Sequence, residues 1–169
     1  MAKIIIGFSN PKKFMIGAEI IKVAQNYAAY SHTYIRFEKT NKMPSVVYHA
    51  AHGLVHFRKF DNFCTGNNVI KEYEIEVSEE IKQQILNLCI NLSGEGYGYL
   101  ELLKIAFADL VYSICNKTIN FKNSRGYICS ELVGIICAKY LGIVFNKPLN
   151  LLKPVHIDQA LLTYINRGV

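Results

Sequence analysis

The sequence predicts an α+β domain in which a meander of β-strands is followed by a run of helices. Apolar and polar residues alternate with a period of two in several segments between residues 32 and 77, as on half-buried strands. After residue 78 the apolar residues recur at helical spacing instead. With 51% apolar and 19% charged side chains and no repeats or linkers, we expect residues 1–169 to form one domain with one core.

Five segments are expected to form an antiparallel sheet. A β-branched apolar run over residues 3–9, ended by Asn10 and Pro11, predicts the first strand. The other strands are expected at residues 32–38, 45–50, 54–60 and 69–77. Gly53 suits a tight turn between two of them, because glycine permits positive φ. We expect a surface turn over residues 64–68.

The helices are predicted from periodicity and from their first residues. Residues 14–28 and 99–115 have helical spacing, and Ser78 is a typical N-cap that is followed by two glutamates. Residues 128–140 are apolar nearly all round, which predicts a helix in the centre of the core. A last short helix should follow Pro154, with Leu161 and Leu162 facing inward.

Charge and targeting signals exclude several classes of protein. The net charge of +6 is scattered, so we do not expect a nucleic-acid partner, although peripheral contact with an anionic surface is compatible with it. The first apolar run stops at Gly7, which is too short for a signal peptide and favours a cytoplasmic location. Residues 100–115 are too short and too charged to cross a bilayer, so no integral membrane segment is expected.

One of five cysteines occupies a position suited to nucleophilic chemistry. None of the five forms a CxxC pair, so neither a disulfide framework nor a zinc site is expected. Cys129 falls in the first turn of the central helix, where free N–H groups and the helix dipole favour a thiolate. We interpret the other four as structural, and a purely structural Cys129 remains the alternative.

A catalytic cysteine needs a base that is itself oriented, and two histidines fit this role. His32 opens one predicted strand and His49 ends the next, so the two can face each other across the sheet. A metal site formed by His49, His52 and His56 is the alternative, but it lacks a carboxylate or cysteine at matching spacing. We therefore expect no metal and no cofactor.

The order of these motifs resembles the circularly permuted NlpC/P60 papain-like proteins, which include the YiiX-like and lecithin retinol acyltransferase-like branches. In that group a histidine strand comes first and a cysteine helix comes late. Here Tyr30-Ser31-His32-Thr33-Tyr34-Ile35 comes early and Cys129-Ser130-Glu131-Leu132-Val133 late. Three further segments are similar along the chain: residues 47–55, residues 97–99, and Pro154 with Asp158 and Leu161.

The resemblance implies a papain-like fold in which the face of the sheet that holds both histidines packs on the cysteine helix. Cys129 would attack a carbonyl, His32 would take and return the proton, and His49 would orient the imidazole. The YiiX-like branch often has a glutamate where this chain has His49. Tyr30 is carried over as a residue near the oxyanion or the substrate.

Three functions remain open at this stage. The first is a cysteine peptidase or amidase acting on a peptide or a peptidoglycan fragment, with a phage origin as the hypothesis that the small, Lys- and Asn-rich chain suggests. The second is an acyltransferase or thioesterase on a lipid-like acyl substrate, which would need an apolar groove along residues 100–112; core packing explains that stretch equally well. The third is a catalytically silent binding or virion module on the same fold.

Overall fold

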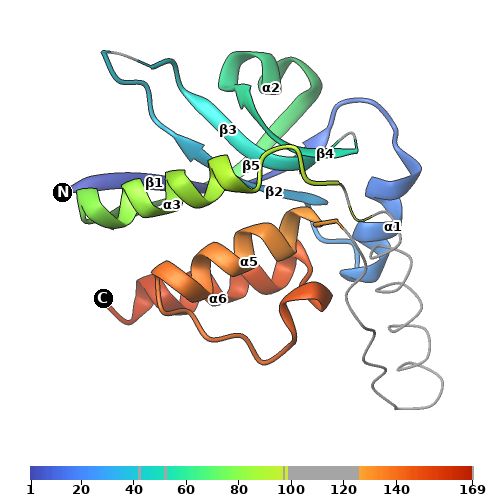
Figure 1. Cartoon of the computed structure of the whole chain (residues 1–169). Coiled ribbons are helices and arrows are strands. Elements are labelled where there is room, and N and C mark those ends of the chain that lie inside the picture. The colour runs from blue at the N-terminus through green and yellow to red at the C-terminus, as the bar shows by residue number, and fades with distance from the viewer. Residues whose placement is uncertain (42, 52, 97, 99–125, 169) are drawn as a thin grey trace.

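A five-stranded antiparallel sheet organises the protein in the computed structural model, which describes residues 1–41, 43–51, 53–96, 98 and 126–168. The strands lie in the order β4-β3-β2-β1-β5 (Figure 1). Their bounds are Ala2–Pro11 (β1), His32–Phe37 (β2), Val46–Ala51 (β3), Leu54–Lys59 (β4) and Asn67–Val77 (β5). The sheet and its helices confirm the predicted α+β class.

Helices cover both faces of this sheet. The helices are α1 (Ile16–Ala24), α2 (Phe60–Gly66), α3 (Glu79–Asn91), α5 (Cys129–Tyr140) and α6 (Pro154–Asn166), with a 3-10 turn η1 at Leu149–Leu151. The main core joins α3, α5 and α6 to one face, and a smaller cluster of Tyr34, Val47 and Phe63 joins α2 to the other (Figure 1). The predicted helix at residues 99–115 lies outside the described residues.

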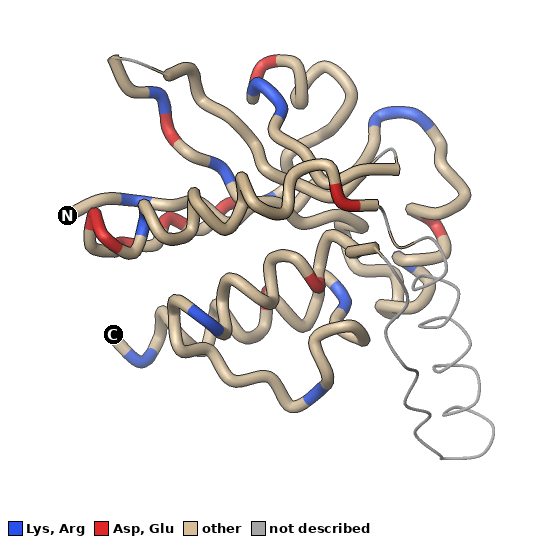
Figure 2. The backbone as a smooth tube through the Cα atoms, in the orientation of Figure 1, with Lys and Arg blue, Asp and Glu red and all other residues tan. Residues whose placement is uncertain are grey.

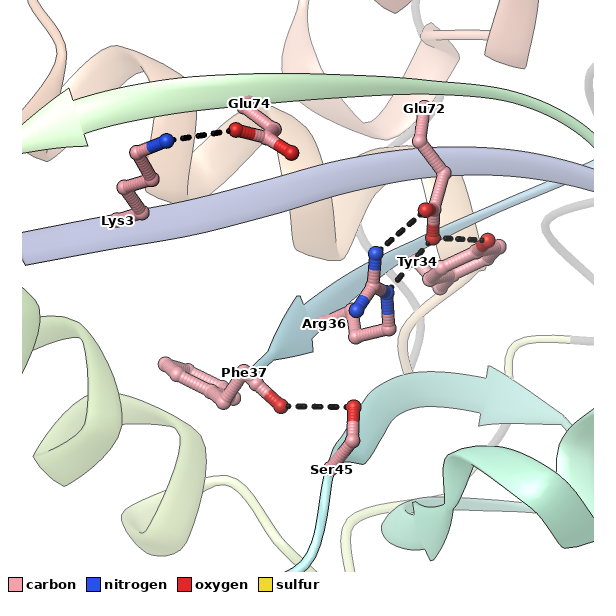
Figure 3. Close-up of polar contacts among 7 residues, drawn as sticks. All are labelled: Lys3, Tyr34, Arg36, Phe37, Ser45, Glu72 and Glu74. Atoms are coloured by element: carbon pink, nitrogen blue, oxygen red, sulfur yellow. Dashed lines mark hydrogen bonds and ion pairs between the residues drawn. The ribbon is translucent and has the colours of Figure 1, made fainter. Parts of the chain in front are cut away.

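Strand β1 is buried on both faces, which is consistent with its continuous apolar run. Ile4 and Ile6 belong to the main core, whereas Ile5 is fully buried on the other side of the strand. Strand β5 lies at the sheet edge and keeps its glutamates outward. Of these, Glu74 forms an exposed ion pair with Lys3 at 2.9 Å (Figure 3).

Glu72 connects β5 to β2 across Gly7 of β1, which pairs with both strands. Its carboxylate accepts hydrogen bonds from Tyr34 at 2.8 Å and from Nε and Nη2 of Arg36 at 2.8 and 2.6 Å (Figure 3). The Tyr34 side chain therefore crosses directly over Gly7. A Cβ at position 7 would overlap the ring of Tyr34, so this crossing requires glycine.

Among the predictions for helices and turns, the N-cap of α3 is confirmed, whereas a surface turn and the orientation of one leucine are wrong. Ser78 accepts a hydrogen bond from the Ile81 N–H as the expected N-cap. The expected turn at residues 64–68 is wrong, because α2 continues to Gly66 and buries Phe63 among the strands. Leu161 is buried as expected, but Leu162 is 41% exposed because it projects from the outer side of α6.

We predict that Gly7→Ala destabilises the protein by about 1–3 kcal/mol, because the added methyl group must displace a fully buried tyrosine. Urea unfolding followed by circular dichroism measures the change. Gly17→Ala in α1 is the control, since a Cβ there meets no atom within 4 Å and should leave stability unchanged or raise it by up to about 1 kcal/mol. Equal stability of the two variants would contradict the role of the Tyr34 crossing.

Candidate active site

The two predicted histidines lie side by side on the sheet. Nε2 of His32 and Nδ1 of His49 are 3.0 Å apart, which is a hydrogen-bond distance, and the rings meet edge to face. Strand β2 pairs antiparallel with β3, so the two side chains fall on one face in diagonal positions. His49 is 1% exposed and His32 is half-buried.

Aromatic rings surround this histidine pair. The ring centroid of Phe63 lies 6.3 Å from that of His32 and 5.3 Å from that of His49. His56, which pairs with His49 across β3 and β4, places its ring 4.7 Å from the same imidazole. Sequence reasoning missed Phe63, although Phe60, Phe63 and Cys64 have the i, i+3, i+4 spacing of a helix face.

Cys129 is the first residue of α5, as predicted, and is 2% exposed. Three backbone N–H groups, those of Thr33, Ser130 and Cys129 itself, lie near its sulfur and act to lower the pKa of the thiol. Two of these belong to the unpaired N–H groups of the first helical turn. The third comes from β2, one residue after His32. Covalent geometry keeps the His32 Cα within roughly 3 Å of that nitrogen, so the backbone of His32 lies near the sulfur.

The thiol of Cys129 is nevertheless protonated at neutral pH. Burial raises its pKa to about 11, and the three N–H groups only partly oppose this. Cys137, two turns later on the same helix, has its pKa raised by burial to about 12. In this closed site desolvation outweighs the helix N–H groups, and the expectation that the helix N-terminus favours a thiolate stays a prediction.

The two histidines and the body of α5 lie on opposite faces of the sheet. Strand alternation places His32 on the side of Tyr34 and α2, whereas Ile35 and Phe37 face α5 in the main core. The expectation that one face of the sheet holds the histidines and packs on the cysteine helix is thus wrong. Pairing of β2 with β3 ends at Ile35, and beyond that point the Thr33 N–H lies near the sulfur of Cys129 instead.

The remaining polar residues singled out from the sequence have other partners. The hydroxyl of Tyr30, expected near the oxyanion, donates to Asp158 at 2.6 Å. Nδ1 of His156 accepts the N–H of Lys153 at the start of α6, where this histidine was expected. His52 and Cys115 lie outside the described residues.

The described residues contain no group of three or more His, Cys, Asp or Glu side chains that could hold a metal ion. Their helices also include none that is both long and apolar enough to cross a membrane. Basic residues are spread over many elements of the described chain (Figure 2). Comparison of the sequence with protein-family models and with curated proteins gives no match in either case. The resemblance to the permuted NlpC/P60 proteins therefore stays a prediction.

We predict that Cys129 makes the protein less stable in alkali. Its pKa is about 11 in the folded protein and about 8.5 in the unfolded chain, so the unfolded state loses its proton first as the pH rises. The contribution of the protonated thiol to the free energy of unfolding is fully present below pH 8. As the pH rises to 11, the free energy of unfolding should fall by roughly 2–3 kcal/mol through this group.

Urea unfolding of wild type and Cys129→Ala at several pH values between 8 and 11 tests this. The variant should lose stability less steeply with pH than wild type. Parallel pH dependences for the two proteins would show that the thiol is not desolvated in the folded state.

Proposed function

We propose that this protein is a cysteine hydrolase that cleaves an amide or peptide bond, with Cys129 as nucleophile, His32 as general base and His49 as the residue that orients His32. The observation that carries the proposal is the 3.0 Å contact between Nε2 of His32 and Nδ1 of His49. A catalytic base needs a partner of this kind to orient it, and the backbone N–H of Thr33, the residue after His32, lies near the Cys129 sulfur.

The chemistry follows from a protonated thiol. Because the pKa of Cys129 is about 11 in the closed site, the proton passes to the His32 imidazole as the sulfur attacks the substrate carbonyl carbon. The carbonyl oxygen becomes an oxyanion that accepts hydrogen bonds from N–H groups at the start of α5. The imidazolium then protonates the leaving nitrogen, and a thioester forms. Water, deprotonated by His32, hydrolyses this thioester and restores the thiol.

The substrate class rests on the resemblance alone. Peptide stems of the bacterial cell wall are the substrate we propose to examine first, and acyl thioesters and lipid-like esters second. One observation favours a catalytically silent binding module instead: Cys129 is 2% exposed, so a substrate reaches the sulfur only after neighbouring groups move. The experiment below separates an active site from such a module.

We predict that alkylation of Cys129 depends on His32. The rate of reaction with iodoacetamide, followed at each cysteine by mass spectrometry from pH 5 to 10, should fall about tenfold at pH 7 in His32→Ala. His49→Ala should give a smaller decrease in the same direction, because it removes only the partner that orients the base.

His56→Ala is the matched control. This residue lies beside His49 on the same face, so its loss tests whether any nearby imidazole matters. It should leave the rate within twofold of wild type, and Cys137 serves as the unreactive internal reference. A Cys129 rate that is unchanged in all three variants would reject the hydrolase and favour the silent module.

A covalent adduct identifies the bond that is cleaved. Peptidoglycan fragments should leave an acyl mass on Cys129 when the reaction is quenched early, whereas labelling by acyl thioesters alone would favour the acyltransferase alternative. Cys129→Ala should show no adduct with either class.

A further inference from the structure

Tyr30, two residues before His32, is connected to α6 in two ways. Its hydroxyl binds a residue of α6 directly, and its carbonyl is connected to α6 through Gln25. Its hydroxyl donates to Oδ2 of Asp158 at 2.6 Å. Its carbonyl accepts from Nε2 of Gln25 at 3.1 Å, and Oε1 of Gln25 accepts the N–H of Val155 at 2.8 Å. Both Tyr30 and Gln25 are buried, so these hydrogen bonds are shielded from water. The chain that enters β2 is thus tied to α6 twice.

Asp158 is a buried carboxylate with three side-chain donors. Besides Tyr30, it accepts from Lys71 at 2.8 Å and from Tyr73 at 2.5 Å, both on β5. Burial alone would raise the pKa of Asp158, but the hydrogen bonds from Lys71, Tyr30 and Tyr73 lower it below its ordinary value. Asp158 therefore stays an ionised acceptor at neutral pH.

Helix α6 is in turn fixed to the cysteine helix. The hydroxyl of Ser130, the residue after Cys129, donates to the Leu152 carbonyl at 2.5 Å, just before α6 begins. Gly134 lets Leu152 and Ile157 approach α5 closely, since a Cβ at Gly134 would come within 2.6 Å of Leu152 Cδ1. These contacts connect α6, which carries Asp158, to the first turns of the helix that begins at Cys129.

The segment around His32 is anchored on its other side by β1. The N–H of Ser31 donates to the Ser9 carbonyl at 3.2 Å, and the hydroxyl of Thr33 donates to the Gly7 carbonyl at 3.0 Å. His32 lies between these anchors. Tyr30 is the residue of this segment that connects it to α6, and through α6 to Cys129.

We propose that Asp158 is a positioning residue of the candidate site: by binding Tyr30 it sets the backbone of residues 31–33, and with it His32 and the Thr33 N–H, relative to the sulfur of Cys129. This inference rests on the proposed function. It also replaces the expected role of Tyr30 near the oxyanion with a role in holding His32 and Cys129 in register.

Four variants test the proposal. Tyr30→Phe deletes only the hydroxyl, and Asp158→Ala deletes the acceptor. Asp158→Asn keeps an acceptor oxygen for Tyr30, and Lys71→Met removes the ion pair of Asp158 but leaves the Tyr30 hydrogen bond in place. Each variant is measured in two ways: the alkylation rate of Cys129 against pH, and backbone hydrogen exchange of residues 31–35.

We expect Tyr30→Phe and Asp158→Ala to reduce Cys129 alkylation at pH 7 about fivefold to tenfold and to shift its pH profile upward. Exchange of the residue 31–35 amides should rise about tenfold in the same variants. Asp158→Asn should restore most of the alkylation rate, and Lys71→Met should stay within twofold of wild type. If Asp158→Ala does not fold, the result for Tyr30→Phe tests the proposal, because this variant removes only one hydroxyl group.

Failure of this inference is distinguishable from failure of the proposed function. If wild type and His32→Ala react alike, the hydrolase is rejected, and hydrogen exchange alone then decides whether Asp158 positions the segment. If His32 controls Cys129 but Tyr30→Phe and Asp158→Ala behave as wild type in both measurements, the positioning role is overturned. It is also overturned if Lys71→Met has the same effect as Tyr30→Phe, since that would indicate general loss of stability.

Discussion

The packing of α5 against β2 and β3 is the interaction on which the rest of the structure depends. Leu132, Val133 and Ile136 of this helix join Ile35 of β2 and Tyr48 of β3 in the main core, all of them buried. Side chains of this kind contribute about 1.5–3 kcal/mol each when they leave water. This contact also determines where the first turn of α5 meets the sheet, and hence where the Cys129 sulfur lies.

That packing affects the pKa of the Cys129 thiol in two opposite directions. Close contact excludes water and raises the pKa of the thiol, whereas the N–H groups of the first turn and of Thr33 favour the thiolate. Burial is the larger effect in the closed structure. A nucleophile in this position therefore depends on a neighbouring base rather than on the helix dipole alone, which is why the histidine pair matters to the proposed chemistry.

Polar interactions between the elements add to the packing of the core. Glu72 connects the edge strand β5 to β2, and Asp158 connects α6 both to β5 and to Tyr30, just before β2. Such half-buried charged hydrogen bonds are stronger and more directional than apolar contacts. They restrict sliding of the strands and helices that the core alone would allow.

Much of the secondary structure was predictable because it depends on local patterns. The alternation of Tyr73, Ile75 and Val77 with glutamates placed β5, and Ser78 placed the start of α3. The helix α2 was missed because its seven residues are rich in turn-forming types. Its helical state comes with the burial of Phe63 against β2 and β3, which is a tertiary effect.

In the candidate site, too, some features follow from local sequence patterns and others only from the tertiary structure. The sequence by itself determined that Cys129 begins a buried helix and that His32 and His49 lie on neighbouring strands, since periodicity and capping act over a few residues. Only the tertiary structure decided that the two imidazoles touch, that the body of α5 packs on the sheet face opposite the histidines, and that Tyr30 binds Asp158. These features depend on strand register and on contacts between residues up to 128 positions apart, which no local pattern encodes.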